Sequence, residues 1–194
     1  MNAPEKIVNT YFRLNGFFLL PQFTNFLGEQ YNHVDLIALR PPSGREVVRG
    51  IAFPVDMEFF DCLKGWTVNP TDILLGVVAE IKGNQEREIP IQAHMDYAIE
   101  FFGGANLIIP VSVSLSYKRI QVNDQVLRIP LQHALQWSLY RIYWVESHLD
   151  YLRKIASWSW SEEFLADLLY LQNIDFSALN YQAKERLKAE EGNQ

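Results

Sequence analysis

The sequence is poor in residues that cross-link a chain or hold zinc. Cys62 is the only cysteine, and the chain has four histidines. No intrachain disulfide can therefore form, and Cys62 and the histidines show none of the spacings typical of zinc sites. Because disulfides are used mainly in oxidising compartments, we expect a protein of the reducing cytoplasm.

The sequence also lacks a long apolar run. No stretch approaches the ~18 apolar residues needed to span a bilayer, so we expect no membrane segment. The first residues, Met1 to Lys6, lack the basic and apolar blocks of a signal peptide. Both features agree with the expected cytoplasmic location.

Positive charge is in short supply. The chain has 17 Lys and Arg against 23 Asp and Glu, a formal net charge of −6 at pH 7. Lys and Arg neutralise phosphates in nonspecific nucleic-acid binding, so this balance argues against a strong general DNA-binding surface. It still permits a nuclease whose few basic residues line one groove.

Apolar residues, in contrast, are abundant. They make up 48% of the 194 residues, enough for one well-buried domain or for a domain with an appendage. Helical and strand-like patterns alternate over residues 1–130, which predicts an α/β core with an insertion at 41–72. The period is helical over 131–194, which predicts an all-helical C-terminal extension.

Several residues mark the ends and irregularities of the predicted core elements. Asn15-Gly16 is expected to stop the first helix, and Pro21 indicates an edge strand or a bulge. The insertion contains a short strand-like run at 47–53 and a helical turn or two at 57–63. The main elements predicted are a helix over 5–15, strands over 17–26, 31–40 and 73–82, a helix over 90–102, a strand over 106–114, and a hairpin over 117–129 turning at Asn123-Asp124.

Three charges interrupt two of these apolar strands. Asp35 lies within the run 34–39, and Glu80 and Lys82 close the run 73–82. Side chains alternate along a strand, so Glu80 and Lys82 share one face about 6–7 Å apart. Buried charges are unfavourable unless they are paired or hold a metal. Asp35 on a neighbouring strand would complete a two-carboxylate site with an amine beside it, which suits phosphodiester hydrolysis.

Over residues 5–116 this arrangement resembles the PD-(D/E)xK nuclease superfamily. That family places an acid on the second core strand and an E-x-K triplet at the end of the third, positions matched by Asp35 and by Glu80 to Lys82. The resemblance implies a restriction-endonuclease-like core, a mixed sheet flanked by helices. Other interpretations are that Asp35 caps a strand end or pairs with an Arg, and that the triplet is a solvated strand end.

The resemblance also implies roles. Asp35 and Glu80 would bind Mg²⁺ or Mn²⁺ through oxygens, and the backbone carbonyl of Ile81 would add a ligand. Lys82 would orient the attacking water or stabilise developing charge. Gln92 lies where several subfamilies place a polar active-site residue.

Other candidate residues each have a functional and a purely structural interpretation. Glu5 would be an extra acid from the first helix or simply a favourable helix N-terminal charge. His33 would meet a phosphate or hydrogen-bond locally at the strand start. The acidic residues of the insertion would reach the metal or form a solvated loop; they are Asp56, Glu58, Asp61 and Asp72.

The extension carries two stripes at helical spacing. One is aliphatic and runs from Leu131 to Ile155. The other mixes aromatic and basic residues, for which we expect a core role first, a dimer interface second and base stacking third. Further helices are expected after Ser161 and from Ser177. The mixed stripe contains Trp137, Arg141, Trp144, His148 and Tyr151.

The sequence therefore predicts a Mg²⁺-dependent nuclease, with DNA as the expected substrate. The catalytic residues expected are Asp35, Glu80, Lys82 and Gln92, and the metal ligands Asp35, Glu80 and Ile81. The alternative is a non-catalytic interaction protein that keeps the same fold. It would assemble with a second copy or another protein through its C-terminal helices.

Overall fold

The computed structural model describes residues 3–27, 30–42, 47–48, 51–82 and 92–148. The chain divides into two compact units, residues 1–144 and 145–194. The described residues up to 144 belong to the first unit, and residues 145–148 belong to the second. The helices expected after Ser161 and from Ser177 lie outside the described residues.

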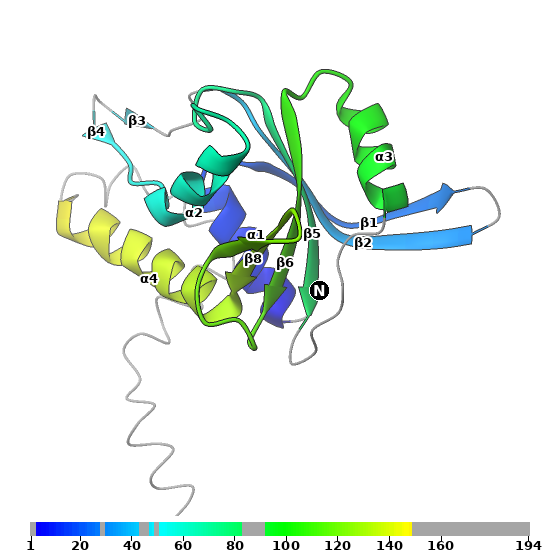
Figure 1. The fold of residues 1–194 in the computed structure, drawn as a ribbon. Helices are drawn as coiled ribbons and strands as arrows, with labels where there is room; N and C mark the ends of the chain where they lie inside the picture. Colours follow the sequence, from blue (N-terminus) through cyan, green and yellow to red (C-terminus); the bar gives the residue numbers. More distant parts are fainter. Residues whose placement is uncertain (1–2, 28–29, 43–46, 49–50, 83–91, 149–194) are drawn as a thin grey trace, which may run out of the picture. The chain divides into compact units, whose positions relative to one another are not determined.

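The first unit is a mixed α/β fold around a six-stranded sheet (Figure 1). The strand order is β1-β2-β5-β6-β8-β7, with β5 parallel to β6, β6 parallel to β8, and the other neighbours antiparallel. A separate two-stranded hairpin, β3 with β4, lies in the predicted insertion. The strands are β1 (Phe18–Leu27), β2 (Gln30–Arg40), β3 (Val47–Val48), β4 (Ile51–Ala52), β5 (Leu75–Lys82), β6 (Leu107–Ser114), β7 (Gln121–Asn123) and β8 (Val126–Pro130).

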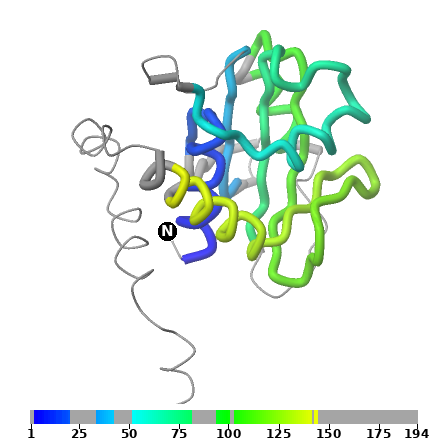
Figure 2. The backbone as a smooth tube through the Cα atoms, turned by 90° about the vertical axis from the view of Figure 1, so that its left-hand side faces the viewer, coloured from blue at the N-terminus to red at the C-terminus, as the bar shows by residue number. Residues whose placement is uncertain are grey.

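Helices cover both faces of this sheet. Figure 1 shows α1, α2 and α4 on one side and α3 on the other, and Figure 2 views the side on which α4 lies. The predicted mixed sheet flanked by helices is thereby confirmed for the described residues. The helices are α1 (Ala3–Leu14), α2 (Met57–Cys62), the short 3₁₀ turn η1 (Leu63–Gly65), α3 (Gln92–Phe102) and α4 (Leu131–His148).

Burial on both faces explains why β5 reads as a nearly continuous apolar run. Leu75, Val77 and Ala79 enter the large cluster with α1, whereas Val78 enters a smaller one with Ala98 of α3. Successive side chains thus alternate between two cores. This places Glu80, which continues the Val78 row, on the α3 side.

Helix α1 ends where the sequence predicts. Asn15 donates from its side-chain amide to the carbonyl of Tyr11 at 2.9 Å, and Gly16 follows with φ 85°. This left-handed residue ends the helix. Pro21 lies in β1, which is an edge strand as predicted.

The hairpin turn differs by one residue from the prediction. The residues with positive φ are Asp124 (49°) and Gln125 (61°), not Asn123 and Asp124. Two consecutive positive φ values suit the right-handed twist of a tight hairpin. Gln125 shows no sequence preference for that conformation, so strand pairing determines the position of the turn.

The mixed stripe of α4 belongs largely to the core. Trp137 packs edge-on against Tyr11 with 5.7 Å between ring centroids, and Trp144 does the same with Phe53 at 5.4 Å. The guanidinium of Arg141 is buried and lies 4.0 Å from the centre of the Phe53 ring. The side chain of His148 and all of Tyr151 lie outside the described residues.

No helix in the described ranges is both long enough and apolar enough to cross a membrane.

Candidate functional site at the end of strands β2 and β5

Asp35 of β2 and Glu80 of β5 both lie at the point where the two strands cease to pair. The antiparallel register runs from Arg40 opposite Leu75 to Leu36 opposite Ala79, and Asp35 and Glu80 are the next residues of the two strands.

A side-chain bond replaces the backbone ladder at this point. The amide of Ile81 donates to Asp35 Oδ2 at 2.7 Å. Hydrogen bonds to ionised acceptors are strong, so this bond holds the Asp35 carboxylate at the end of β5. Ile81, which donates this bond, follows Glu80 directly in β5.

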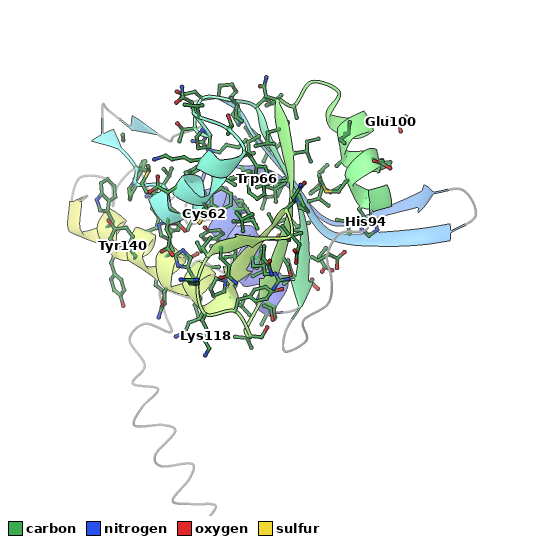
Figure 3. All side chains as sticks on the ribbon, viewed as in Figure 1. Cys62, Trp66, His94, Glu100, Lys118 and Tyr140 are labelled. Carbon is green, nitrogen blue, oxygen red and sulfur yellow. The ribbon has the colours of Figure 1, made fainter. Side chains whose placement is uncertain are left out.

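The Glu80 carboxylate faces α3. Its Oε1 lies 3.8 Å from Nδ1 of His94, and the side chains of His94 and Glu80 are only 7% and 13% exposed. Figure 3 shows His94 on the α3 side of the sheet. The site therefore combines two half-buried carboxylates with an imidazole close to one of them.

The donor chemistry fits a hard divalent cation. Within the described residues, no three His, Cys, Asp or Glu side chains are placed to share a metal ion. Mg²⁺ does not require such a set, because it is commonly held by one or two carboxylates plus waters and substrate oxygens. Asp35 and Glu80, with the Ile81 carbonyl, would form a site of that open kind.

Two predicted catalytic residues are placed by their backbones only. Lys82 is the last residue of β5, paired with Ser114 of β6, and Gln92 opens α3. Their side chains, and that of His33 in β2, lie outside what the structure describes. Their predicted roles stay predictions.

The acids of the insertion have local partners. Asp56 is 2% exposed and caps α2, where its Oδ1 accepts from the amides of Glu58 and Phe59 at 3.1 and 3.4 Å. Asp61 pairs with Lys64 at 2.7 Å. Asp72 accepts from Thr71, and Glu5 is buried in the first turn of α1.

A second polar cluster was missed by sequence reasoning. Asp56 Oδ2 accepts a 2.6 Å hydrogen bond from the Tyr11 hydroxyl and lies 2.7 Å from Nε2 of His133, in the first turn of α4. Only the cap was visible in the sequence, as an Asp before a short apolar helix. His133 is 77 positions from Asp56, and nothing local pairs them.

The contacts within this cluster shift the pKa values of Tyr11 and His133. Burial, followed by the charge of and hydrogen bond to Asp56, raises the pKa of Tyr11 well above its usual value. Burial lowers the pKa of His133, but the hydrogen bond to Asp56 and the charges of Asp56 and Glu58 outweigh it, so the net shift is upward from 6.5.

Comparisons with known protein families, curated proteins and solved structures find no match to this chain.

Proposed function

We propose that the chain is a Mg²⁺- or Mn²⁺-dependent nuclease that hydrolyses phosphodiester bonds in DNA, built on a restriction-endonuclease-like core. One observation carries the proposal. The Asp35 carboxylate accepts the Ile81 amide at 2.7 Å and so lies at the end of the strand that bears Glu80.

The order of elements supports this proposal. Helix α1 precedes the antiparallel strands β1, β2 and β5, and α3 leads to β6, which runs parallel to β5. The acid strand and the E-x-K strand are therefore neighbours, although 34 residues separate Arg40 from Leu75 in the chain. The same order underlies the resemblance to the PD-(D/E)xK superfamily.

The residues divide the chemistry between them. A divalent cation bound by Asp35, Glu80 and the Ile81 carbonyl would supply Lewis acidity and lower the pKa of a bound water. Lys82 would orient that water or stabilise charge on the phosphate. Gln92 would contact the substrate from the start of α3. His94, which lies 3.8 Å from Glu80, would position the Glu80 carboxylate.

A second candidate function is assembly with a protein partner or a second copy of the chain. Tyr140 and Tyr143 of α4 are 51% and 50% exposed, and aromatic residues of this kind are enriched at interfaces. Figure 3 shows Tyr140 projecting from α4. In this reading the C-terminal helices carry the function and the Asp35–Glu80 pair does no chemistry.

Cleavage assays separate the two candidates. Plasmid and oligonucleotide substrates, in DNA and RNA forms, are incubated with Mg²⁺ or Mn²⁺ and with an EDTA control. We expect Asp35→Asn, Glu80→Gln and Lys82→Ala each to lose at least about 100-fold in rate, the effect of removing one group that stabilises transition-state charge. Asp61→Asn, the same acid-to-amide change at an exposed site, is the matched control and should keep full activity.

The controls also fix what would contradict the proposal. Circular dichroism should show each variant folded, since the amide substitutions preserve side-chain shape. Metal-dependent activity that survives all three substitutions would place the chemistry elsewhere. A wild type that cleaves no substrate and binds no metal would favour the assembly protein.

A further inference from the structure

A cavity of about 520 Å³ lies on the α4 side of the sheet. Its walls come from the loop that follows β6, the first turns of α4, and Glu58 of α2. Small-molecule sites commonly measure roughly 300–1,000 Å³. Lys118 and His94 lie apart in Figure 3, so this cavity is distinct from the Asp35–Glu80 pair, which faces α3.

His133 forms a fixed part of the wall. Its Nε2 is held at 2.7 Å by the Asp56 carboxylate, whose side chain is 3% exposed. Its Nδ1 lies 3.7 Å from Oε2 of Glu58, which is 57% exposed and so able to move. Tyr11 supports Asp56 from α1 through a 2.6 Å hydrogen bond. The imidazole therefore has one fixed and one adjustable partner.

The wall of the cavity carries two cations, which is unusual because the chain as a whole is acidic. Lys118 and Arg119 both line the cavity and are exposed. Lys118 pairs with no carboxylate in the described part of the chain, and Arg119 donates from Nε to the neutral side chain of Gln121 at 3.2 Å. When His133 is protonated, the negative charge of Asp56 balances it. The other charged side chains of the wall are then two cations, Lys118 and Arg119, and one anion, Glu58.

We propose that this cavity binds a small organic phosphate monoester, with the phosphate between Lys118, Arg119 and His133. A phosphate monoester carries roughly −1.5 to −2 charges near neutral pH, which is opposite in sign to the net positive charge of the wall. Gln132 and Gln136, on the same helix as His133, supply amide groups for the organic part. The volume exceeds what a phosphate alone would fill, which leaves room for a sugar or a base.

Isothermal titration of the full chain tests this site. The probes are glucose 6-phosphate and AMP, each compared with its parent lacking phosphate, glucose and adenosine, at one fixed ionic strength. We expect the two phosphates to bind and the two parents not to bind. Absence of binding by both phosphates at millimolar concentration, or equal binding of the parents, overturns the proposal.

Two cation variants locate the binding. Lys118→Ala combined with Arg119→Ala should weaken glucose 6-phosphate binding about tenfold or more, as expected for lost charge-assisted hydrogen bonds. Lys64→Ala removes an exposed lysine that pairs with Asp61 outside the cavity, and it should bind like wild type. Equal losses of affinity in both variants would show that binding depends only on the net charge of the protein.

The pH dependence assigns the role of His133. The titratable and charged groups around it are Tyr11, Asp56, Glu58, Lys118 and Arg119. Wild-type affinity should fall as pH rises through the pKa of His133, whereas His133→Gln should lack this component and retain a hydrogen bond to Asp56. The titration of the phosphate itself is common to both proteins. Identical pH profiles would remove His133 from the site.

Discussion

Replacing Tyr11 with Phe isolates one buried hydrogen bond. The Tyr11 side chain is 1% exposed, and its ring packs against Phe12, Phe59 and Trp137. Tyr11→Phe keeps that packing and removes only the hydroxyl that donates to Asp56 Oδ2 at 2.6 Å. Any loss of stability therefore measures this bond.

The size of the loss follows from what remains around Asp56. A hydrogen bond to a charged group contributes about 1.5–3 kcal/mol. Asp56 would keep His133 and the amides of Glu58 and Phe59, so its carboxylate would not be left unpaired. We therefore expect a loss near the lower limit, about 1.5–2 kcal/mol, which for a chain of this size lowers Tm by roughly 3–8 °C.

Urea unfolding at neutral pH, followed by circular dichroism, measures this change. Tyr140→Phe is the matched control, because the Tyr140 side chain is 51% exposed, and its stability should stay within about 0.5 kcal/mol of wild type. A double-mutant cycle with His133→Ala should show coupling, since both side chains bond the same carboxylate oxygen, Asp56 Oδ2. An unchanged free energy of unfolding for Tyr11→Phe would refute the buried network.

Two further predictions concern charge. The pKa of His133 is raised above 6.5 in the folded state, so the stability that its protonated form contributes is complete below pH 6.5 and is lost as pH rises through the folded pKa. The difference in unfolding free energy between wild type and His133→Gln should shrink over that window; a constant difference would contradict it. Glu80→Gln should raise Tm without metal, because it removes repulsion from Asp35. Calorimetry in EDTA measures this, and a lowered Tm would show that Glu80 is already stabilised in the fold.

Much of the fold is encoded in local patterns. The strand predicted over 73–82 is Leu75–Lys82, and the helix predicted over 5–15 is Ala3–Leu14. Both rest on apolar periodicity and on stop signals, which act within a few residues. The placement of Asp35 and Glu80 at the same end of two neighbouring strands needed one more step, the pairing of β2 with β5.

The buried face of α4 shows where such patterns fail. The aliphatic stripe predicts Leu131, Leu135 and Leu139 as the core face, but only Leu131 of these is fully buried. Ser138 and Arg141 are buried instead. Ser138 donates to the carbonyl of Ala134 at 2.7 Å, and Arg141 stacks on Phe53. Polar residues buried in this way are invisible to a hydrophobic pattern.

The Asp56–His133–Tyr11 network could not be predicted for a related reason. Its members come from α1, the insertion and α4, and they lie 45 and 77 positions apart. Tertiary packing alone brings them together. Each residue alone has an ordinary local interpretation.

The central claim is that Asp35 and Glu80 hold a divalent cation. A crystal of the wild type soaked in Mn²⁺, with anomalous diffraction collected near the manganese edge, tests it most directly. We predict one anomalous peak within roughly 2.0–2.6 Å of an oxygen of each carboxylate and of the Ile81 carbonyl. The peak should be absent from Glu80→Gln crystals treated in the same way. Wild-type crystals without a peak between Asp35 and Glu80, or with manganese bound elsewhere, would contradict the account.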